Sequence, residues 1–390
     1  MSERGERLRA IIIGAGIGGL TAAIALRRAG VTPVMAERAG SLENLHLGAG
    51  IHLWSNALQA LGQVGIGDAV AAIGTPMTTQ RYLTSTGRTL GQLDVAGLSR
   101  SLGAPTIGAS RPQLHRVLTE ALDDVEVRVG ATCVGFEQDR RGVTARFADG
   151  TEMRGDVLLG ADGINSVVRR QLHGSRPPVY AGYTAWRAIT DFAHTRVPVG
   201  EMWIHWGRGA RILHYHVSDG RVYWLAMVRA PQGGTDPPAG HRDAVMRHYR
   251  GWPEPIEALI ATTQEEAISR TDIVDRDPLQ HWGTGRVTLL GDAAHPMSPN
   301  LAQGAGQAIE DGVALGNLFS GQADPVEALR GYERRRRDRA NGMLTTSRMV
   351  GRMSLMRSPV TCAVRDHMAL RMVYATYGRK KARQDLTAVT

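Results

Sequence analysis

Apolar and polar positions follow two different periods along the chain, and the changes between them predict the elements. Near the N-terminus, the apolar run Ala10–Ile13 is typical of a strand buried on both faces of a parallel sheet. Thr21–Arg28 then repeats apolar positions every three or four residues, which predicts a helix, and Val31–Ala36 predicts a second strand. This succession is typical of a βαβ unit in an α/β fold.

Two kinds of sheet are expected further along the chain. The apolar segments Asp156–Gly160 and Arg286–Leu290 predict additional strands of the parallel sheet. Between Tyr183 and Arg229, four strands follow at short spacing with alternating character, which predicts an antiparallel sheet with one covered face. A hairpin is expected at residues 81–95. Helices are expected from Ser55 as N-cap, from Arg111, and over Asn165–Leu172, Arg242–Tyr249, Pro255–Ala261 and Ala302–Phe319.

Three glycines and one acid in the first unit indicate its chemistry. Gly14, Gly16 and Gly19 form the spacing G-x-G-x-x-G between strand and helix, and Glu37 ends the second strand. These glycines permit a tight turn, a close approach of backbone N–H groups to a pyrophosphate, and close packing of helix on strand. A carboxylate 23 residues after Gly14 is placed to accept hydrogen bonds from a ribose. The unit therefore predicts dinucleotide binding.

Composition excludes several classes of protein. The 390 residues suffice for two domains or one large two-part molecule, and 43% hydrophobic residues are ordinary for a folded chain. Cys133 and Cys362 lie far apart, so neither a metal site nor a disulfide framework is predicted, and a cytoplasmic location is expected. Ala10–Leu26 imitates the apolar region of a signal peptide, but its glycines and the acid that follows argue against that interpretation. No other uncharged run has the length of a membrane span.

Positive charge is concentrated at the C-terminal end. The formal net charge is +9, and residues 330–390 hold 15 Lys and Arg against 4 Asp and Glu, a net of +11 that leaves −2 for the rest. Arg334–Arg337 is expected on a solvated helix face, while contact with a membrane surface or an acidic partner is the alternative interpretation. Nucleic acid is not an expected partner, because no aromatic interleaving or recognised module accompanies the charge. Four methionines are expected to pack against the first domain: Met343, Met349, Met353 and Met356.

Three separated pieces of the chain form a set that resembles a known enzyme family. They are the glycine turn with Glu37, the segment GADGINSVVR around Asp162, and the segment GDAAHPMSPNLAQGAGQAIED around Asp292. From Ala10 to about Arg339 the chain resembles the single-component FAD-dependent aromatic hydroxylases, which are class A flavoprotein monooxygenases with the para-hydroxybenzoate hydroxylase fold. The pattern is most similar to the salicylate, 3-hydroxybenzoate and urate hydroxylase branch.

The resemblance implies an α/β fold with a Rossmann-type FAD-binding domain of the GR2 type. An antiparallel β-sheet substrate domain is expected as an insertion, followed by C-terminal helices. The expected parts are a discontinuous FAD-binding domain (1–75, 97–180 and 265–330), a substrate-covering β-sheet domain (76–96 and 181–264) and a C-terminal helical region (331–390).

The resemblance also implies which residues hold FAD. The glycine turn would bind the pyrophosphate, Glu37 the adenosine ribose, and Asp292 a ribityl hydroxyl. Asp162 belongs to a motif that the family links to both FAD and the reduced nicotinamide. The implied set is Gly14, Gly16, Ile17, Gly19, Glu37, Arg38, Gly50, Arg111, Val134, Asp162, Asp292, Pro299, Gln303, Gly304, Ala305 and Gly306.

The loop beside the flavin departs from the family pattern at two positions. Ala302 stands where the family has glycine, and Gly306 stands where Asn or Cys is common. Because alanine adopts a positive φ less readily than glycine, the sequence leaves the backbone turn at this loop open. A helix that begins after the loop would direct partial positive charge at the ring and favour the anionic reduced flavin.

The implied reaction inserts one oxygen atom of O₂ into a small aromatic or heteroaromatic substrate. NADH or NADPH would reduce FAD, O₂ would form a flavin C4a-hydroperoxide, and the strand-rich insertion would exclude water. Histidine, tyrosine and arginine side chains on the insertion could hydrogen-bond or deprotonate a phenol, although a structural role is the competing interpretation for each. The substrate-side candidates are His52, His205, His214, Tyr215, His216 and Arg187. His295 is interpreted as structural support.

Two other functions stay open at this point. One is an epoxidase or tailoring oxygenase of a larger apolar natural product, which would need a pocket much larger than one ring. The other is a non-catalytic, flavin-bound binding or regulatory protein. Halogenation is disfavoured because W-x-W-x-I-P is absent, and plain NAD-dependent dehydrogenation would leave Asp292 and Arg111 unexplained. The expected partner is a small-molecule substrate, and the expected assembly is a monomer or homodimer.

Overall fold

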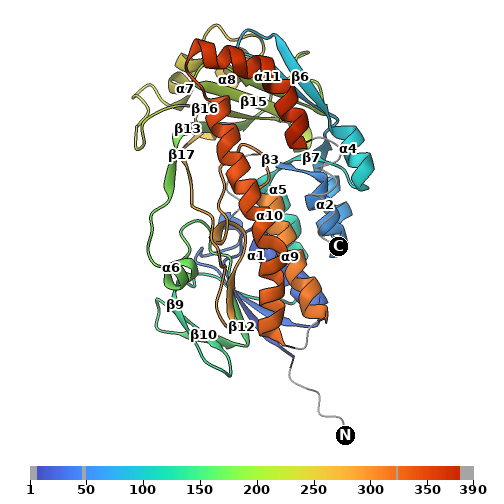
Figure 1. Cartoon of the computed structure of the whole chain (residues 1–390), viewed down its shortest axis with the longest axis vertical. Helices are drawn as coiled ribbons and strands as arrows, with labels where there is room; N and C mark the ends of the chain where they lie inside the picture. Colours follow the sequence, from blue (N-terminus) through green and yellow to red (C-terminus); the bar gives the residue numbers. More distant parts are fainter. Residues whose placement is uncertain (1–6, 46–49, 322–323, 378–390) are drawn as a thin grey trace.

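The computed structural model describes residues 7–45, 50–321 and 324–377. A parallel sheet lies at one end of the molecule and a seven-stranded sheet at the other, and the long helix α10 runs between them (Figure 1). The helices are α1 (Ile17–Arg28), α2 (Ser55–Gln63), α3 (Gly67–Ala72), α4 (Val95–Leu102), α5 (Arg111–Glu120), α6 (Val167–His173), α7 (His241–Tyr249), α8 (Ile256–Thr262), α9 (Gly304–Gly321), α10 (Pro325–Ser354) and α11 (Pro359–Tyr377). Short 3₁₀ turns are η1 (Glu43–Leu45), η2 (Ser218–Gly220), η3 (Glu265–Ala267) and η4 (Gly291–Ala293).

The parallel sheet has the strand order β18-β12-β1-β2-β8, and every neighbouring pair is parallel. The N-terminal βαβ unit lies at its centre, as the apolar runs predict for strands covered on both faces. Its strands are β1 (Arg9–Ile13), β2 (Thr32–Ala36), β8 (Glu126–Arg128), β12 (Val157–Gly160) and β18 (Val287–Leu289).

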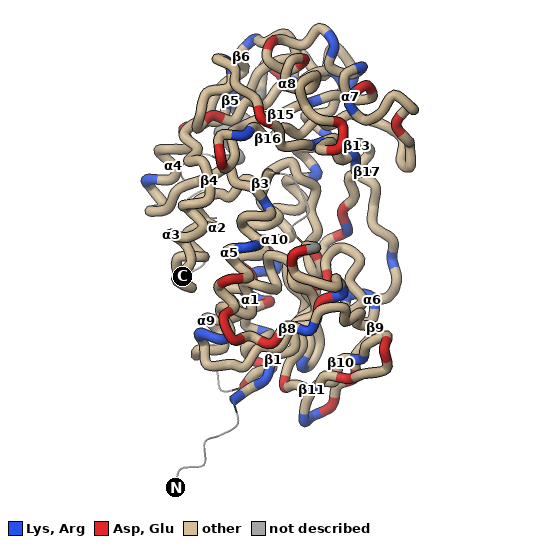
Figure 2. Tube along the Cα trace, turned by 180° about the vertical axis from the view of Figure 1, so that it is seen from behind, with Lys and Arg blue, Asp and Glu red and all other residues tan. Residues whose placement is uncertain are grey.

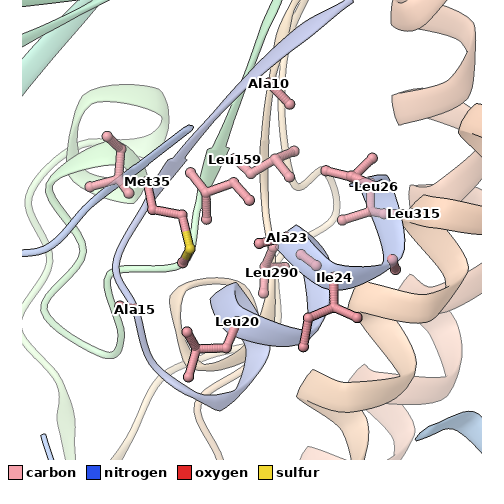
Figure 3. Packing of buried hydrophobic residues seen from close by; sticks show 14 of the residues in the cluster. Ala10, Ala15, Leu20, Ala23, Ile24, Leu26, Met35, Leu159, Leu290 and Leu315 are labelled. Carbon is pink, nitrogen blue, oxygen red and sulfur yellow. The ribbon is translucent and has the colours of Figure 1, made fainter. Parts of the chain in front are cut away.

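Helix α1 is enclosed between this sheet and α9, and the three elements form the largest apolar core (Figure 3). Small residues allow the two helices to approach closely. A Cβ added at Gly312 would lie 2.6 Å from the Ala22 nitrogen, and one added at Gly316 would lie 2.8 Å from the Ala25 oxygen. The close packing holds the N-terminal ends of both helices at the same edge of the sheet.

The seven-stranded sheet has the order β17-β13-β16-β15-β14-β5-β6. Its pairs are antiparallel except β14 with β5, which are parallel. β17 follows residue 264, so the sheet includes a strand beyond the boundary expected there. Its strands are β5 (Thr79–Thr84), β6 (Thr89–Asp94), β13 (Val179–Thr190), β14 (Glu201–Trp206), β15 (Ala210–His216), β16 (Val222–Val228) and β17 (Ser269–Asp275).

The expectation that this sheet has one covered face is wrong. All residues of β15 and β16 are buried. Helices α7 and α8 cover one face around Trp224 and Tyr249, and the other face borders an apolar cluster that includes Leu213 and Met353. The polar positions on these strands are Arg211 and several histidine, tyrosine and tryptophan side chains. Such side chains are fully buried less often than aliphatic ones, but here the two layers enclose them.

Two small sheets and the C-terminal helices complete the fold. Ser55 begins α2 rather than capping it, and its hydroxyl instead lies 2.9 Å from the Thr106 hydroxyl. Residues 378–390, the end of the expected C-terminal region, lie outside the described residues. No helix in the described part of the chain is both long and apolar enough for a membrane crossing. The remaining strands are β3 (Gly50–Leu53), β4 (Gly74–Pro76), β7 (Ile107–Ser110), β9 (Cys133–Gln138), β10 (Val143–Phe147) and β11 (Glu152–Gly155).

Candidate active site

A cavity of about 360 Å³ lies between the carboxyl ends of the parallel strands and the seven-stranded sheet. Gly16 follows β1, Ala161 follows β12 and Asp292 follows β18, and all three line the cavity. Ligands of open α/β sheets bind at this edge. The cavity therefore brings together the three separated motifs.

The glycine turn packs tightly on one side and is open on the other. Gly14 has a φ of 105°, and a Cβ there would lie 2.5 Å from the Ala161 oxygen. A Cβ at Gly19 would lie 2.1 Å from the Gly14 oxygen, so both positions require glycine. Gly16 instead has nothing within 4 Å of an added Cβ and, with Ile17, faces the cavity. The N-terminus of α1, which no side chain caps, thus opens into the cavity.

The acid at the end of β2 secures this turn. The Glu37 carboxylate accepts hydrogen bonds from the backbone N–H groups of Ala15 at 2.8 Å and Ala39 at 2.9 Å. Glu37 is buried but does not line the cavity, and Arg38 and Val134 are exposed outside it. The structure therefore places these three residues outside the cavity, with Glu37 against the glycine turn.

The second motif supports the third. One oxygen of Asp162 accepts the Val167 N–H at 2.7 Å at the start of α6, and burial raises the pKa of this carboxyl. Arg169 of the same helix donates to the carbonyl oxygens of Ala293 at 3.1 Å and Ala294 at 2.9 Å. Burial lowers the pKa of Arg169 to about 10, and the guanidinium holds the η4 loop in place. Arg169 ends the segment GADGINSVVR, but the sequence does not predict that it binds the backbone of the η4 loop.

Asp292 lies at the centre of the η4 loop. Asp292 is surrounded by other parts of the protein, and its accessible surface is the part that faces the cavity. Burial raises the pKa of Asp292, while His295 and Arg111 oppose that rise. Arg111 begins α5 and lines the cavity, as the Arg-Pro helix start predicts.

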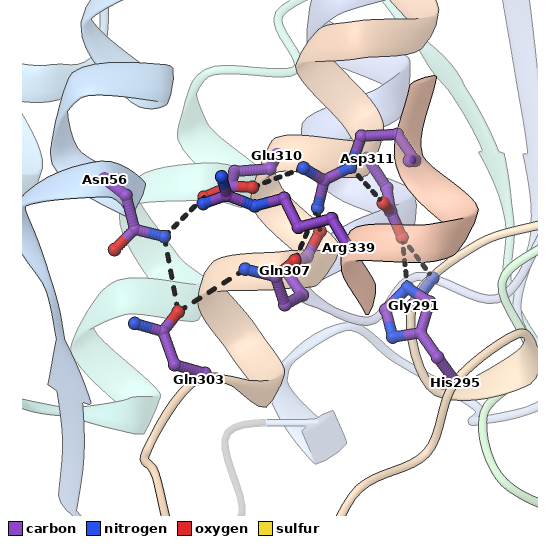
Figure 4. Close-up of polar contacts among 9 residues, drawn as sticks. Asn56, Gly291, His295, Gln303, Gln307, Glu310, Asp311 and Arg339 are labelled. Atoms are coloured by element: carbon purple, nitrogen blue, oxygen red, sulfur yellow. Dashed lines mark hydrogen bonds and ion pairs between the residues drawn. The ribbon is translucent and has the colours of Figure 1, made fainter. Parts of the chain in front are cut away.

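A buried polar network fixes the loop that precedes α9 (Figure 4). Asp311 accepts hydrogen bonds from the Gly291 N–H at 2.9 Å and from His295 Nε2 at 2.6 Å, and it pairs with Arg336 at 2.8 Å. Arg336 also pairs with Glu310. Burial alone would raise the pKa of Asp311, but His295 and Arg336 hold it at about 2.

The same network reaches the start of α9. Asn56 of α2 donates to Gln303 Oε1 at 3.3 Å and also to Glu310. Gln303 and Gly306 are buried against this network, whereas Pro299, Gly304 and Ala305 line the cavity. Ala302 adopts a φ of 52°, so the alanine takes the backbone conformation that its glycine counterpart would prefer.

The sheet supplies the opposite wall of the cavity. Among the sequence candidates, Tyr215 of β15 and Arg187 of β13 lie on this wall, and His52 of β3 lies beside it. Gly50 also lines the cavity and packs against the ring of Tyr223, because an added Cβ would lie 2.5 Å from Tyr223 Cγ. The sequence did not identify the other wall residues: Gln80, Tyr82, Met202, Ile204, Arg211, Leu213, Tyr223 and Leu225.

Four of these missed residues are polar, and two tyrosines and an arginine among them can donate hydrogen bonds through a hydroxyl or a guanidinium. Burial raises the pKa of Tyr82 and Tyr223 to about 12, so both hydroxyls stay protonated at neutral pH. Arg211 is 2% exposed and donates to Asn300 Oδ1 at 3.3 Å and to the Ser354 hydroxyl at 3.4 Å. Arg211 alternates with Tyr215 on β15, and Tyr223 and Tyr82 lie on the same face from β16 and β5, but only the fold shows which face of the sheet lines the cavity.

His52 is the histidine that faces the cavity. It is 3% exposed, and its ring packs edge-on to Trp54 at 4.7 Å between centroids. Burial lowers the pKa of His52 to about 3, so the imidazole is neutral at physiological pH. Neither ring nitrogen has a hydrogen-bond partner among the described residues, although the residue lines the cavity.

The other three histidines lie outside the cavity. His205 and His214 are neighbours on the opposite face of the sheet, with ring centroids 5.9 Å apart, and burial lowers their pKa values to about 4 and about 3. The ring nitrogens of His216 lie 3.1 Å from the Gly220 oxygen and 2.9 Å from the Val197 oxygen. The structure therefore does not bring these side chains to the site, because residues of this parity lie on the face that packs against α7, α8 and Val197.

Comparison with known proteins identifies the family. The chain matches the FAD binding domain family over residues 7–347. The chain belongs to the FAD binding domain family. The aurachin C monooxygenase/isomerase of Stigmatella aurantiaca is 39% identical over 381 residues, which cover 97% of this chain and 98% of that relative. The FAD-dependent urate hydroxylase of Mycolicibacterium vanbaalenii is 35% identical and covers 87% of both chains.

Solved structures of the family have the same architecture. The Klebsiella pneumoniae HpxO, complexed with FAD and uric acid, superposes with a TM-score of 0.89 at 29% identity, over 99% of this chain and 97% of that chain. The FAD-binding chain is therefore an FAD-dependent monooxygenase, and the expected family, α/β fold and cofactor are confirmed. O₂ and a reduced nicotinamide are the typical co-substrates of this class. A non-catalytic role is set aside.

The residues of the cavity fit FAD. The open side of Gly16 and the uncapped N-terminus of α1 leave backbone N–H groups available to a pyrophosphate. The enclosed carboxylate of Asp292 faces the cavity, where a hydroxyl could satisfy it. Gly304 and Ala305, at the N-terminus of α9, lie on the same wall.

Proposed function

We propose that the enzyme inserts one oxygen atom of O₂ into a small aromatic or heteroaromatic compound, with NADH or NADPH as electron donor. The observation that carries this proposal is a single cavity with two unlike walls. One wall consists of the three FAD-family motifs, and the other consists of aromatic and apolar side chains with two arginines. Relatives that hydroxylate ring compounds by name support the same conclusion.

We infer the FAD contacts from the placement of the motifs. Gly14, Gly16, Ile17 and Gly19 would hold the pyrophosphate, and Asp292 would accept a ribityl hydroxyl. Bound FAD supplies the redox chemistry that activates O₂. Glu37, Arg38 and Val134 would contact the adenosine end outside the cavity. Arg111, Pro299, Gly304 and Ala305 would flank the ring, with Gln303 and Gly306 behind them. The N-terminus of α9 would favour negative charge there.

The substrate wall points to a compound that carries an oxygen substituent. Arg187 and Arg211 bring positive charge to the wall, and the protonated hydroxyls of Tyr82 and Tyr223 can donate hydrogen bonds. Neutral His52 can donate or accept one more. These groups would orient a phenol, enol or ring carbonyl, and the apolar residues between them would exclude water.

The size of the cavity favours a small substrate over a large natural product. Its volume of about 360 Å³ is near the lower end for ligand pockets, and a flavin ring would share it. Epoxidation stays the second candidate, because zeaxanthin epoxidases of plants are 32–35% identical over 90% of this chain. In those relatives the match covers only 55–56% of the protein.

The first experiment replaces the carboxylate that faces the cavity. Asp292→Ala should weaken FAD binding by about 10- to 100-fold, because one buried hydrogen bond to a charged group is lost. Titration of apoprotein with FAD measures the Kd, and circular dichroism checks that the fold is retained. Exposed Asp191 provides the matched control, and Asp191→Ala should leave the Kd unchanged. Equal FAD affinity in both variants would contradict the assignment.

The second experiment tests the substrate class. In a panel of phenols, hydroxylated heteroaromatics and alkenes, at least one ring compound should accelerate flavin reduction by NADH or NADPH and yield a hydroxylated product. Stopped-flow absorbance of the flavin and mass spectrometry of the product measure both effects. Reduction stimulated only by long-chain alkenes, with an epoxide as product, would instead support the second candidate.

We also propose where the enzyme is located and how it assembles. A cytoplasmic location agrees with Cys133 and Cys362, which are both free and buried. A monomer or homodimer is the assembly that we expect.

A further inference from the structure

A second hollow lies outside the active site, between the C-terminal part of α10 and α11. Its volume is about 680 Å³, and its lining is mainly apolar. Four methionines contribute flexible, polarisable side chains that adapt to irregular partners. The apolar lining residues are Met349, Met353, Met356, Val360, Val364 and Met368.

The apolar side chains of this hollow, which we call the α10–α11 groove, are unusually exposed. Met349 is 49% exposed, Val360 73%, Val364 55% and Met368 47%. This contradicts the sequence expectation that Met349 packs against the first domain. On α11 the three exposed residues are four positions apart and share one face, while Cys362 is buried on the other. A cluster of this kind marks a binding surface rather than scattered exposure.

Polar contacts hold the groove in a defined shape. Arg365 donates to the Gly207 oxygen at 3.0 Å and to the Ser354 oxygen at 3.1 Å, which fixes α11 to the sheet and to α10. Arg348 pairs with Asp275 at 2.7 Å and fixes α10 to β17. The exposed apolar face is therefore presented by anchored helices.

Positive charge lies beside the groove. Residues 342–368, whose side chains the structure describes, hold four Arg against one Asp, a net of +3. Arg352 lines the groove and is exposed, and Arg357 lies at the turn between the helices. Elsewhere, seen from behind, basic and acidic residues are mixed over both ends of the molecule (Figure 2). The groove thus combines apolar exposure with a local excess of cations.

We propose that the α10–α11 groove docks on an anionic phospholipid surface. Exposed valine and methionine side chains would enter the interface, and the arginines would contact lipid phosphates. A second copy of the chain fits less well, since it would bring two arginine-rich surfaces of +3 together. The chain's own residues 378–390 fit less well because most of them are basic, polar or small.

Docking would place the active site next to lipid. Met353, at the base of the groove, belongs to the apolar cluster that also contains Leu213 and Tyr223 of the cavity wall. The surface would therefore bring membrane-dissolved, apolar ring compounds close to the enzyme. The docking itself does not depend on the proposed reaction, so the two can fail separately.

Co-sedimentation of the holoenzyme with lipid vesicles tests the proposal. The protein should bind phosphatidylcholine vesicles that contain about one-third phosphatidylglycerol and should bind pure phosphatidylcholine at least about tenfold more weakly. Raising salt from about 0.1 to 0.5 M should release most of the bound protein, because the Debye length falls.

Variants separate the groove from general charge. Val360→Glu with Val364→Glu should lower vesicle binding by about tenfold or more, since two apolar side chains that would enter the lipid interface become charged. The matched control is Val179→Glu with Val199→Glu, two valines that are 46% and 71% exposed elsewhere, and it should bind as the parent does. Equal binding by both double variants would overturn the proposal. So would absence of vesicle binding, or a dimer in light scattering that the groove variant abolishes.

Discussion

At the scale of single residues, the alanine before α9 shows how a local cost is tolerated at a binding loop. Ala302 adopts a φ of 52° between the cavity-lining Leu301 and buried Gln303. A residue with a Cβ loses roughly 1–2 kcal/mol in this left-handed region. Neighbouring contacts hold the turn, because Trp54 donates to the Leu301 oxygen at 3.0 Å and Asn56 donates to Gln303.

Ala302→Gly should therefore stabilise the apoprotein. We expect the free energy of unfolding to rise by about 1 kcal/mol, since glycine adopts this backbone conformation without strain. Chemical denaturation measures the change. Ala258→Gly, in the middle of α8, is the control and should lower stability by about 1 kcal/mol. If both substitutions destabilise the protein equally, Ala302 is not strained.

The residues of the site divide into those that local sequence identifies and those that only the fold reveals. Gly14 and Gly19 could be predicted, because the turn needs glycine for reasons internal to the motif. The bridge from Arg169 to the Asp292 loop could not, since its partners are backbone carbonyls 124 and 125 residues away. Arg211 lies on a strand whose two faces are both buried, so alternation alone does not select it.

At the scale of elements, α10 acts as a support for the cavity rather than as a solvated tail. The sequence expectation holds for Arg334 and Arg335, which are exposed, but it is wrong for Arg336, which is 1% exposed. A run of four arginines hides this difference, because a helix turns each one to a different side. Only the position of α9 shows that Arg336 faces Glu310 and Asp311.

Arg336→Met should weaken both the fold and FAD binding. It leaves two buried carboxylates without their main cation, and breaking such a pair costs roughly 3–5 kcal/mol. FAD affinity should also fall, because Asp311 positions the η4 loop through the Gly291 N–H. Denaturant unfolding and FAD titration measure the two effects. Arg335→Met, on the exposed side of the same turn, should change neither, and similar losses in both variants would contradict this role.

At the scale of the whole molecule, neutral imidazoles are buried both beside the cavity and on the far face of the seven-stranded sheet. His52 lies on β3 beside the cavity, while His205 and His214 lie on the far face of the seven-stranded sheet. Burial lowers their pKa values to about 3, about 4 and about 3, from an ordinary value of 6.5. The sequence marked these residues as candidates for proton transfer, but their common property in the fold is exclusion of charge.

The stability of the enzyme should therefore fall as the pH falls below 6.5. Between pH 6.5 and about 4 the unfolded chain binds protons at these histidines and the folded chain does not, so acid favours unfolding by about 1.4 kcal/mol per pH unit for each. Denaturant unfolding of the apoprotein at several pH values in this range measures the slope. Replacing His205 and His214 by Gln should lower the slope by about 2.8 kcal/mol per pH unit, whereas exposed His281→Gln should leave it unchanged. A slope that survives the double replacement would show that other groups, such as the Asp311 network, govern the acid response.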